Sequence, residues 1–193
     1  MRAATLEKVH SAAVRLFAHR GFAATSMRDI AREAGISTGL IYRHHATKDD
    51  LFAALVAGAA DGLRDVAARL RADSSPAGLV REFTAGFVAD VDGTRGFAEF
   101  FLLMNQAFAA PGGGAPVRAL VTQHVAMVEA TVALIVRGQR LGQFRRGDPA
   151  QLATCYFAAL SGLATMKLAL GERLVVPHPS LLAGWLIEEG TVD

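Results

Sequence analysis

Apolar residues recur along most of the chain at intervals of three and four, the spacing of a helix that buries one face. In the first segment they stand at Leu6, Val9, Ala13, Leu16 and Phe17, which predicts a helix over about 5–19. No sustained alternation of apolar and polar residues predicts a strand. Further helices are predicted at about 26–34, 37–44, 47–72, 76–91, 95–107, 117–141, 149–166 and 179–189. The pattern therefore predicts an all-α fold of about nine helices.

Capping residues mark where several of these helices begin. Ser26 is followed three residues later by Asp29, the spacing of a capping box. Thr47 is placed to cap the helix that runs to about residue 72. Asp148-Pro149 suits the N-cap and the first position of the apolar helix.

Residues 149–166 carry no charge over 18 positions, which reaches the lower length limit of a membrane-spanning helix. The stretch contains Gln151, Tyr156 and Ser161, and it follows Asp148-Pro149. We therefore expect a helix buried on most sides in a soluble protein, with a partner covering one side. The N-terminus lacks the apolar segment of a signal peptide, so we expect a cytoplasmic protein without a membrane partner.

Composition narrows the class of protein further. The 193 residues are 52% hydrophobic and 20% charged, which excludes a disordered or low-complexity chain. Cys155 is the single cysteine, so neither an internal disulfide nor a cysteine-based zinc site is possible, and we expect it to be buried and unreactive. The sequence has no paired carboxylates in an apolar context, no nucleophile–base pattern and no phosphate-binding glycine loop. We expect a protein that is not an enzyme and that uses no cofactor.

Positive charge gathers at the N-terminal end of the chain. Residues 1–48 hold eight lysines and arginines against three acidic residues, a net of +5, whereas residues 49–193 have a net of −3. A basic segment on a near-neutral body is typical of a module that binds a polyanion. The bias supports that interpretation only if the basic side chains share one face.

Residues 25–52, TSMRDIAREAGISTGLIYRHHATKDDLF, predict two short helices joined by a tight turn. Gly35 supplies the positive φ that such a turn often needs, and Ala31 is small where the helices must cross. The second helix starts with the short polar residues 37–39, which let a backbone approach base edges in the major groove. Donors further along, such as Tyr42 and Arg43, are suited to grip phosphates.

The pattern T-S-M-R-D-I-A-x-E-A-G-I-S-x-G-x-x-Y-x-H-x-x-x-K-x-x-L resembles the TetR family of bacterial transcriptional regulators, specifically over about residues 5–55. The resemblance implies a helix-turn-helix DNA-binding domain over 1–50 and a ligand-binding and dimerisation domain over 51–193, linked by the helix at about 48–72. It also implies a homodimer that binds a palindromic double-stranded DNA operator, most often as a repressor. A small-molecule effector would release the DNA, and the near absence of charge in the body favours an apolar or neutral one.

The resemblance also assigns DNA contacts to positions that match the family motif. It places phosphate contacts at the start of the first motif helix, base contacts at the start of the recognition helix, and further phosphate contacts beside it and at the next helix. The first phosphate contacts are Thr25, Ser26 and Arg28. The base contacts are Ser37, Thr38 and Gly39, and the further phosphate contacts are Tyr42, His44 and Lys48. His45 departs from the family, which usually has a buried aromatic residue there, and this puts local packing in doubt.

Each of these residues also has a structural interpretation. Serines and threonines at these places cap helices whether or not they touch DNA, and single basic residues usually lie on a solvated face. His44 and His45 are adjacent, so their side chains point about 100° apart on a helix, and no third ligand is near in sequence. We therefore expect no metal site.

The body of the chain is rich in large, flexible apolar side chains that suit either a ligand pocket or an ordinary core. We expect an apolar pocket with a few polar contacts. The candidate residues are Phe83, Phe87, Phe100, Met104, Gln123, His124, Met127 and Phe157.

Small residues in the apolar helix permit close approach of another helix, and the last helix has an apolar stripe. The residues expected at a dimer interface are Ala158, Ala159, Gly162, Leu181, Leu182 and Trp185. Two other classes of protein remain open: a helical ligand-binding or interaction protein that does not bind DNA, and an enzyme on a helical scaffold.

Overall fold

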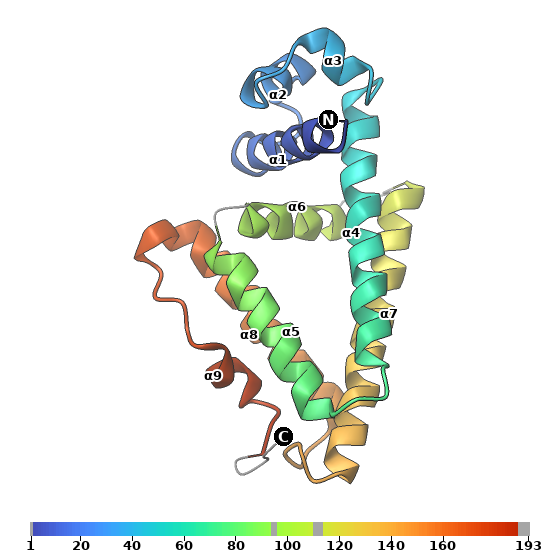
Figure 1. Cartoon of the computed structure of the whole chain (residues 1–193), viewed down its shortest axis with the longest axis vertical. Coiled ribbons are helices and arrows are strands. Elements are labelled where there is room, and N and C mark those ends of the chain that lie inside the picture. Colours follow the sequence, from blue (N-terminus) through green and yellow to red (C-terminus); the bar gives the residue numbers. More distant parts are fainter. Residues whose placement is uncertain (1, 94–95, 110–113, 189–193) are drawn as a thin grey trace. The chain divides into compact units, whose positions relative to one another are not determined.

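The computed structural model describes residues 2–93, 96–109 and 114–188. Within these ranges nine α-helices form, together with one isolated antiparallel bridge between Phe144 and Ile187, so the all-α prediction is confirmed (Figure 1). The chain divides into two compact units. The first comprises the residues up to 60 together with 95–121, and the second comprises 61–94 together with the residues from 122 onward.

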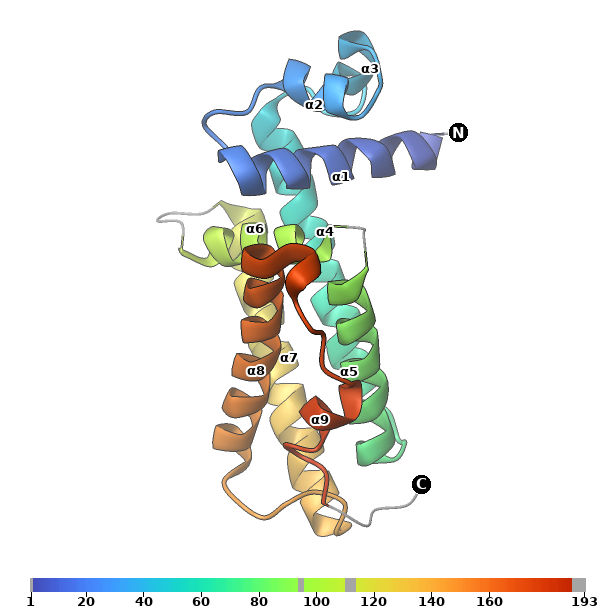
Figure 2. The same cartoon turned by 90° about the vertical axis from the view of Figure 1, so that its left-hand side faces the viewer.

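The first unit is built around α1 (Arg2–Arg20). The short helices α2 (Met27–Glu33) and α3 (Thr38–Tyr42) lie on one side of α1, and α6 (Phe97–Ala109) packs on the other (Figure 2). The start of α4 (Lys48–Leu70) and the start of α7 (Ala115–Arg140) also belong to this unit. Its fully buried side chains include Val9, Ala13, Phe17, Ile30, Ile41 and Leu51, most of them at the predicted helical spacing.

The second unit contains the rest of α4 and α7 with α5 (Pro76–Asp92), α8 (Pro149–Leu170), a 3-10 turn (Gly171–Arg173) and α9 (Pro179–Ala183). Leu134, Ile135, Phe144, Tyr156 and Leu160 are among the side chains of its apolar core. The packing of α5 against α8 and α9 closes this core.

One polar pair is buried in the second unit. The Tyr156 hydroxyl lies 2.6 Å from Thr84 Oγ1, which in turn donates to the carbonyl oxygen of Val80. Burial raises the pKa of Tyr156 to about 12, so the phenol stays neutral and donates to Thr84. Both hydroxyls are therefore satisfied in an apolar surrounding.

The apolar helix α8 buries one face, not most of its surface. Ala153, Tyr156, Leu160, Leu163 and Ala164 face the core, and the residues of the opposite face remain exposed in a single chain. A single chain therefore buries only one side of α8, and burial on most sides, which we expected with a partner covering one side, stays a prediction for the assembly. By length and hydropathy alone, Ala115–Arg140 and Pro149–Arg173 are compatible with membrane spans, as core helices of soluble proteins also are.

The last helix is shorter than the predicted 179–189, because α9 ends at Ala183. Beyond Gly184 the backbone pairs with the loop between α7 and α8. The Arg145 N–H donates to the carbonyl oxygen of Leu186 at 2.9 Å, and the Glu188 N–H donates to that of Gln143 at 3.0 Å. The N–H groups of Leu186 and Ile187 still donate to the carbonyl oxygen of Ala183, but the N–H of Glu188 is used by the loop, so helical hydrogen bonding does not continue through Glu188.

Gly138, in the last turn of α7, lies under the ring of Phe144, and a Cβ there would come within 2.7 Å of Phe144 Cγ. We expect Gly138→Ala to lower the free energy of unfolding by about 1–3 kcal/mol, because the buried ring cannot move away without strain. Gly86→Ala is the matched control, since a Cβ on that helical glycine meets no atom within 4 Å. It should raise stability by about 0.5–1 kcal/mol. Urea unfolding of both variants checks the opposite signs, and equal effects contradict the packing argument.

Candidate nucleic-acid interface

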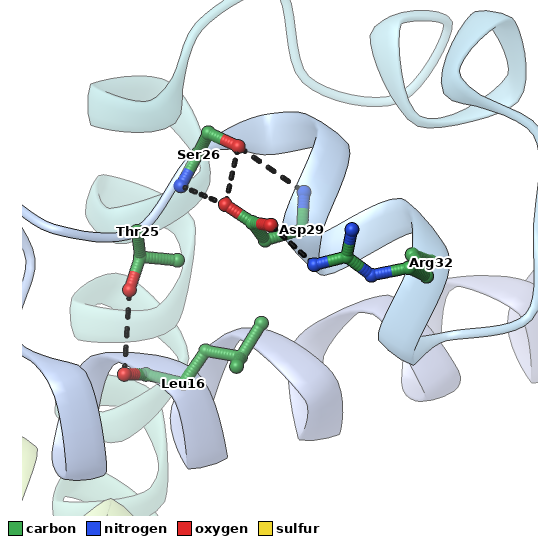
Figure 3. Close-up of polar contacts among 5 residues, drawn as sticks. All are labelled: Leu16, Thr25, Ser26, Asp29 and Arg32. Atoms are coloured by element: carbon green, nitrogen blue, oxygen red, sulfur yellow. Dashed lines mark hydrogen bonds and ion pairs between the residues drawn. The ribbon is translucent and has the colours of Figure 1, made fainter.

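A capping box sets the beginning of α2. The Ser26 hydroxyl accepts the N–H of Asp29 at 3.2 Å, and the Asp29 carboxylate accepts the N–H of Ser26 at 3.1 Å (Figure 3). Hydrogen bonds from Ser26, together with nearby Arg32, hold the pKa of the Asp29 carboxyl below its usual value. The predicted capping box is therefore confirmed, and Ser26 remains exposed at the helix end.

A tight turn joins α2 to α3. Gly35 takes φ +66°, a left-handed conformation that residues with a side chain rarely adopt. The next N–H, of Ile36, donates back to the carbonyl oxygen of Ala31 at 3.0 Å. Ser37 then caps α3, with its hydroxyl accepting the N–H of Leu40 at 3.3 Å. The turn predicted from Gly35 is present, and it directs α3 across α2.

The two faces of α3 differ in exposure. Ile41 is fully buried, while Ser37 and Gly39 are exposed and the Tyr42 side chain is 50% exposed. Thr38 is half-buried. The small polar start of the helix is thus open to solvent, as reading base edges in a groove requires.

Some arginines near these helices form ion pairs with acidic side chains, and others are exposed to solvent. Arg15 pairs with Glu33 at 3.1 Å, and Arg32 pairs with Asp29 in its own helix. Arg28 and Arg43 are exposed, and His44 is half-buried at the end of α3. Arg28 is thus the exposed arginine among the predicted phosphate contacts.

Two residues predicted to contact phosphates, Thr25 and Lys48, have side chains that donate hydrogen bonds within the chain. The Thr25 side chain is 2% exposed and its hydroxyl donates to carbonyl oxygens of Leu16, at 3.3 Å, and Gly21, at 2.9 Å (Figure 3). A buried hydroxyl that donates inside the chain cannot reach a phosphate, so the contact assigned to Thr25 is corrected to a structural role. The Lys48 ammonium donates to carbonyl oxygens of the loop between α1 and α2, so two of its three protons are used within the chain.

His45 packs against His10 of α1, a partner that the sequence did not indicate because 35 residues separate the two. Their Nε2 atoms lie 3.4 Å apart and their ring centroids 5.4 Å apart. Burial is the main cause that lowers the pKa of both histidines. His44 lowers both further, whereas Asp50 opposes the shift at His45. Among the described residues, no group of three or more His, Cys, Asp or Glu side chains is arranged to hold a metal ion.

The predicted pocket residues are distributed over both units. Phe100 and Met104 lie in the first unit, and the other six lie in the second. Met127 is a buried member of the second unit's core, and Phe83, Phe87 and Phe157 pack against that core. Gln123 is half-buried, as is His124, whose pKa is lowered by burial. For Phe83, Phe87, Met127 and Phe157, the structure thus favours the core interpretation that the sequence left open.

Four of the six predicted dimer residues are exposed in the second unit, and the other two, Ala159 and Leu182, are half-buried. Ala158 and Gly162 are exposed on α8, and Leu181 and Trp185 are 67% and 50% exposed. Cys155 is exposed on the same helix, so its predicted burial is wrong. An apolar groove of about 330 Å³ runs beside α8. Its lining residues are Ala159, Gly162, Leu163, Met166, Leu174, Val175, Pro177 and Leu182.

Two short helices at a tight turn, with the N-terminal end of the second exposed, define a helix-turn-helix module. Residues 10–55 match the family of bacterial regulatory proteins called the tetR family. The HTH-type transcriptional repressor Rv3405c of Mycobacterium tuberculosis is 44% identical over 69 residues, which cover 36% of this chain and 35% of that protein. Residues 10–55 therefore carry the helix-turn-helix module of the TetR family of transcriptional regulators. The matched stretch spans only about a third of such curated relatives.

Solved structures extend the likeness in fold to nearly the whole chain. The MbdR regulator from Azoarcus sp. CIB superposes with a TM-score of 0.72 at 22% identity, covering 98% of this chain and 100% of that one. SmeT, in a complex with triclosan, superposes with a TM-score of 0.71 at 20% identity, covering 97% and 93%. At these identities the likeness concerns the fold alone.

We expect the stability of the first unit to fall as the pH is lowered from 7.5 to 5.5. The folded-state pKa values of His10 and His45 lie below the unfolded value of about 6.5. The unfolded chain therefore binds more protons, and the stability present above pH 6.5 is lost as the pH falls from that value through the lower folded-state pKa values. Thermal unfolding at several pH values measures the effect.

His45→Phe should flatten this pH dependence, because it removes one titrating ring and its repulsion of a charged His10. His45→Gln is the control for loss of the aromatic ring, and it should flatten the profile too while lowering stability at pH 7.5. A His45→Phe profile as steep as that of the natural chain contradicts the assignment.

Proposed function

We propose that the chain is a transcriptional regulator that acts as a repressor and binds a palindromic DNA operator with α3 in the major groove. The observation that carries this proposal is the exposed start of α3, with Ser37 and Gly39 open on a helix otherwise fixed by buried Ile41. Family membership supports a regulator rather than an enzyme.

The DNA contacts follow from exposure and position. Ser26 and Arg28 lie at the beginning of α2, where the helix end and a cation favour a phosphate. Ser37, Thr38 and Gly39 are assigned to base edges, and Tyr42 and His44 to the flanking phosphates. The net charge of +5 over residues 1–48 adds a sequence-independent attraction to DNA.

The exposed side of α8 supports a homodimer. Ala158 and Gly162 leave room for close approach, and Leu181 and Trp185 supply apolar area that is costly to leave in water. Leu182 and Ala159 line the adjoining groove. Two copies present two recognition helices, which must lie about 34–36 Å apart, or a multiple of this, to enter successive turns of one duplex.

A small apolar or neutral effector is proposed to control the spacing of the two recognition helices. Gln123 and His124, both half-buried on α7, are its candidate polar contacts. The complexes of SmeT with triclosan and of a Saccharomonospora viridis regulator with choline support a small-molecule ligand for this fold. An effector that binds more tightly to a conformer unable to span both grooves shifts the population away from DNA. A protein with this role acts inside the cell.

Sequencing of genomic fragments retained by the purified protein tests the proposal. We expect enrichment of a short palindrome, because a symmetric dimer reads two equal half-sites. Diffuse binding at low salt without any enriched sequence contradicts it and favours a helical ligand-binding protein without DNA function.

Arg28→Met should weaken binding to that palindrome at low salt and flatten the dependence of log K on log [salt]. Removing one phosphate-binding cation lowers the slope by about 0.9. Arg64→Met is the control, because Arg64 is an exposed arginine of α4 that pairs with Asp61 and lies outside the helix-turn-helix. Its slope should match that of the natural chain, and equal slopes for both variants contradict the contact assigned to Arg28.

Ala158→Glu should convert the dimer to a monomer, because it places charges on the face where two copies of α8 meet. Ala89→Glu, on the exposed face of α5, is the control and should leave the dimer intact. Sedimentation velocity distinguishes the two states. A dimer that survives Ala158→Glu places the interface elsewhere.

A further inference from the structure

Lys48 is the first residue of α4, where its positive charge opposes the local electrostatics. The N-terminal end of a helix carries partial positive charge, so acidic residues are favoured there and a lysine is not. Asp49 and Asp50 follow the usual preference, and Asp50 and Thr47 form a reciprocal cap. Helix formation alone therefore does not account for the lysine.

The ammonium group of Lys48 instead closes the loop between α1 and α2, residues 21–26. It donates to the carbonyl oxygen of Phe22 at 2.6 Å and to that of Thr25 at 2.8 Å, and it lies 4.3 Å from the centre of the Phe22 ring. Hydrogen bonds from a charged donor are roughly twice as strong as neutral ones. Three contacts thus join the first residue of α4 to one loop.

Other contacts make the same loop rigid. The Phe22 ring packs against Phe52 of α4 and Phe17 of α1, with centroids 5.4 and 5.2 Å away. The buried Thr25 hydroxyl ties the loop to the end of α1. Thr25 directly precedes Ser26, the cap of α2, so its carbonyl group lies next to the beginning of α2.

We propose that Lys48 is a positioning residue that holds the beginning of α2 to the beginning of α4, rather than a residue that binds a DNA phosphate. A displacement of α4 is then passed through the ammonium to Thr25, Ser26 and the DNA contacts of α2. The inference rests on the proposed DNA-binding function. Its first test nevertheless needs no DNA, so the two can fail separately.

The first measurement is amide hydrogen exchange of the full chain without DNA. Lys48→Met should raise exchange at residues 21–26, because the loop loses both bonds to its carbonyl groups. Lys48→Arg, which retains a cation with several donors, should restore protection. Arg28→Met is the matched control, since it removes a nearby cation outside the loop and should leave exchange there unchanged. Unchanged exchange in Lys48→Met overturns the proposal, whatever the protein does with DNA.

The second measurement is operator affinity over a range of salt concentrations. Lys48→Met should lower affinity about tenfold at every salt concentration and leave the slope of log K against log [salt] unchanged. Arg28→Met should flatten that slope by about 0.9, the effect of one phosphate-binding cation. A Lys48→Met slope that flattens to the same extent, with normal exchange in the loop, identifies a phosphate contact and overturns the positioning role. If the natural chain binds no operator, the proposed function fails and the exchange result still decides the role of Lys48.

Discussion

Helices of five and seven residues are too short to be stable in water, so α3 and α2 exist only because the first unit holds them. Buried Ile30 and Ile41 anchor the two helices by their inner faces. The capping box at Ser26 and the cap at Ser37 satisfy backbone groups that such short helices otherwise leave open. The exposed surface of the helix-turn-helix therefore depends on a buried surface on its other side.

Polar residues of the motif divide into two roles that their residue types do not distinguish. Thr25 and Ser26 are adjacent hydroxyl residues, yet one is buried against the end of α1 and the other caps α2 at the surface. Arg28 and Lys48 are both cations, but only Lys48 has carbonyl groups within reach. In each pair the surroundings engage one member in contacts with a distant segment and leave the other exposed at the beginning of α2.

The second unit shows the same division among apolar residues. Met127 and Tyr156 lie in its core, whereas Leu181 and Trp185, which the sequence makes equally apolar, remain in water. The open side of α8 is the consequence of a long apolar helix that has core residues on one side only. An apolar surface of this kind explains why composition suggested burial that a single chain does not provide.

Local signals were sufficient for the helix order, the capping box at Ser26 and the turn at Gly35, because capping and backbone conformation depend on residues three or four positions apart. The family motif was recognisable for the same reason, since its residues lie within one short segment. The partners of Lys48, by contrast, are 23 and 26 positions away, and His10 and His45 are 35 positions apart. The early end of α9 also depends on pairing with the distant loop at residues 143–145. These contacts follow from how the helices pack, and no periodicity within a segment encodes which residues of another segment it will meet.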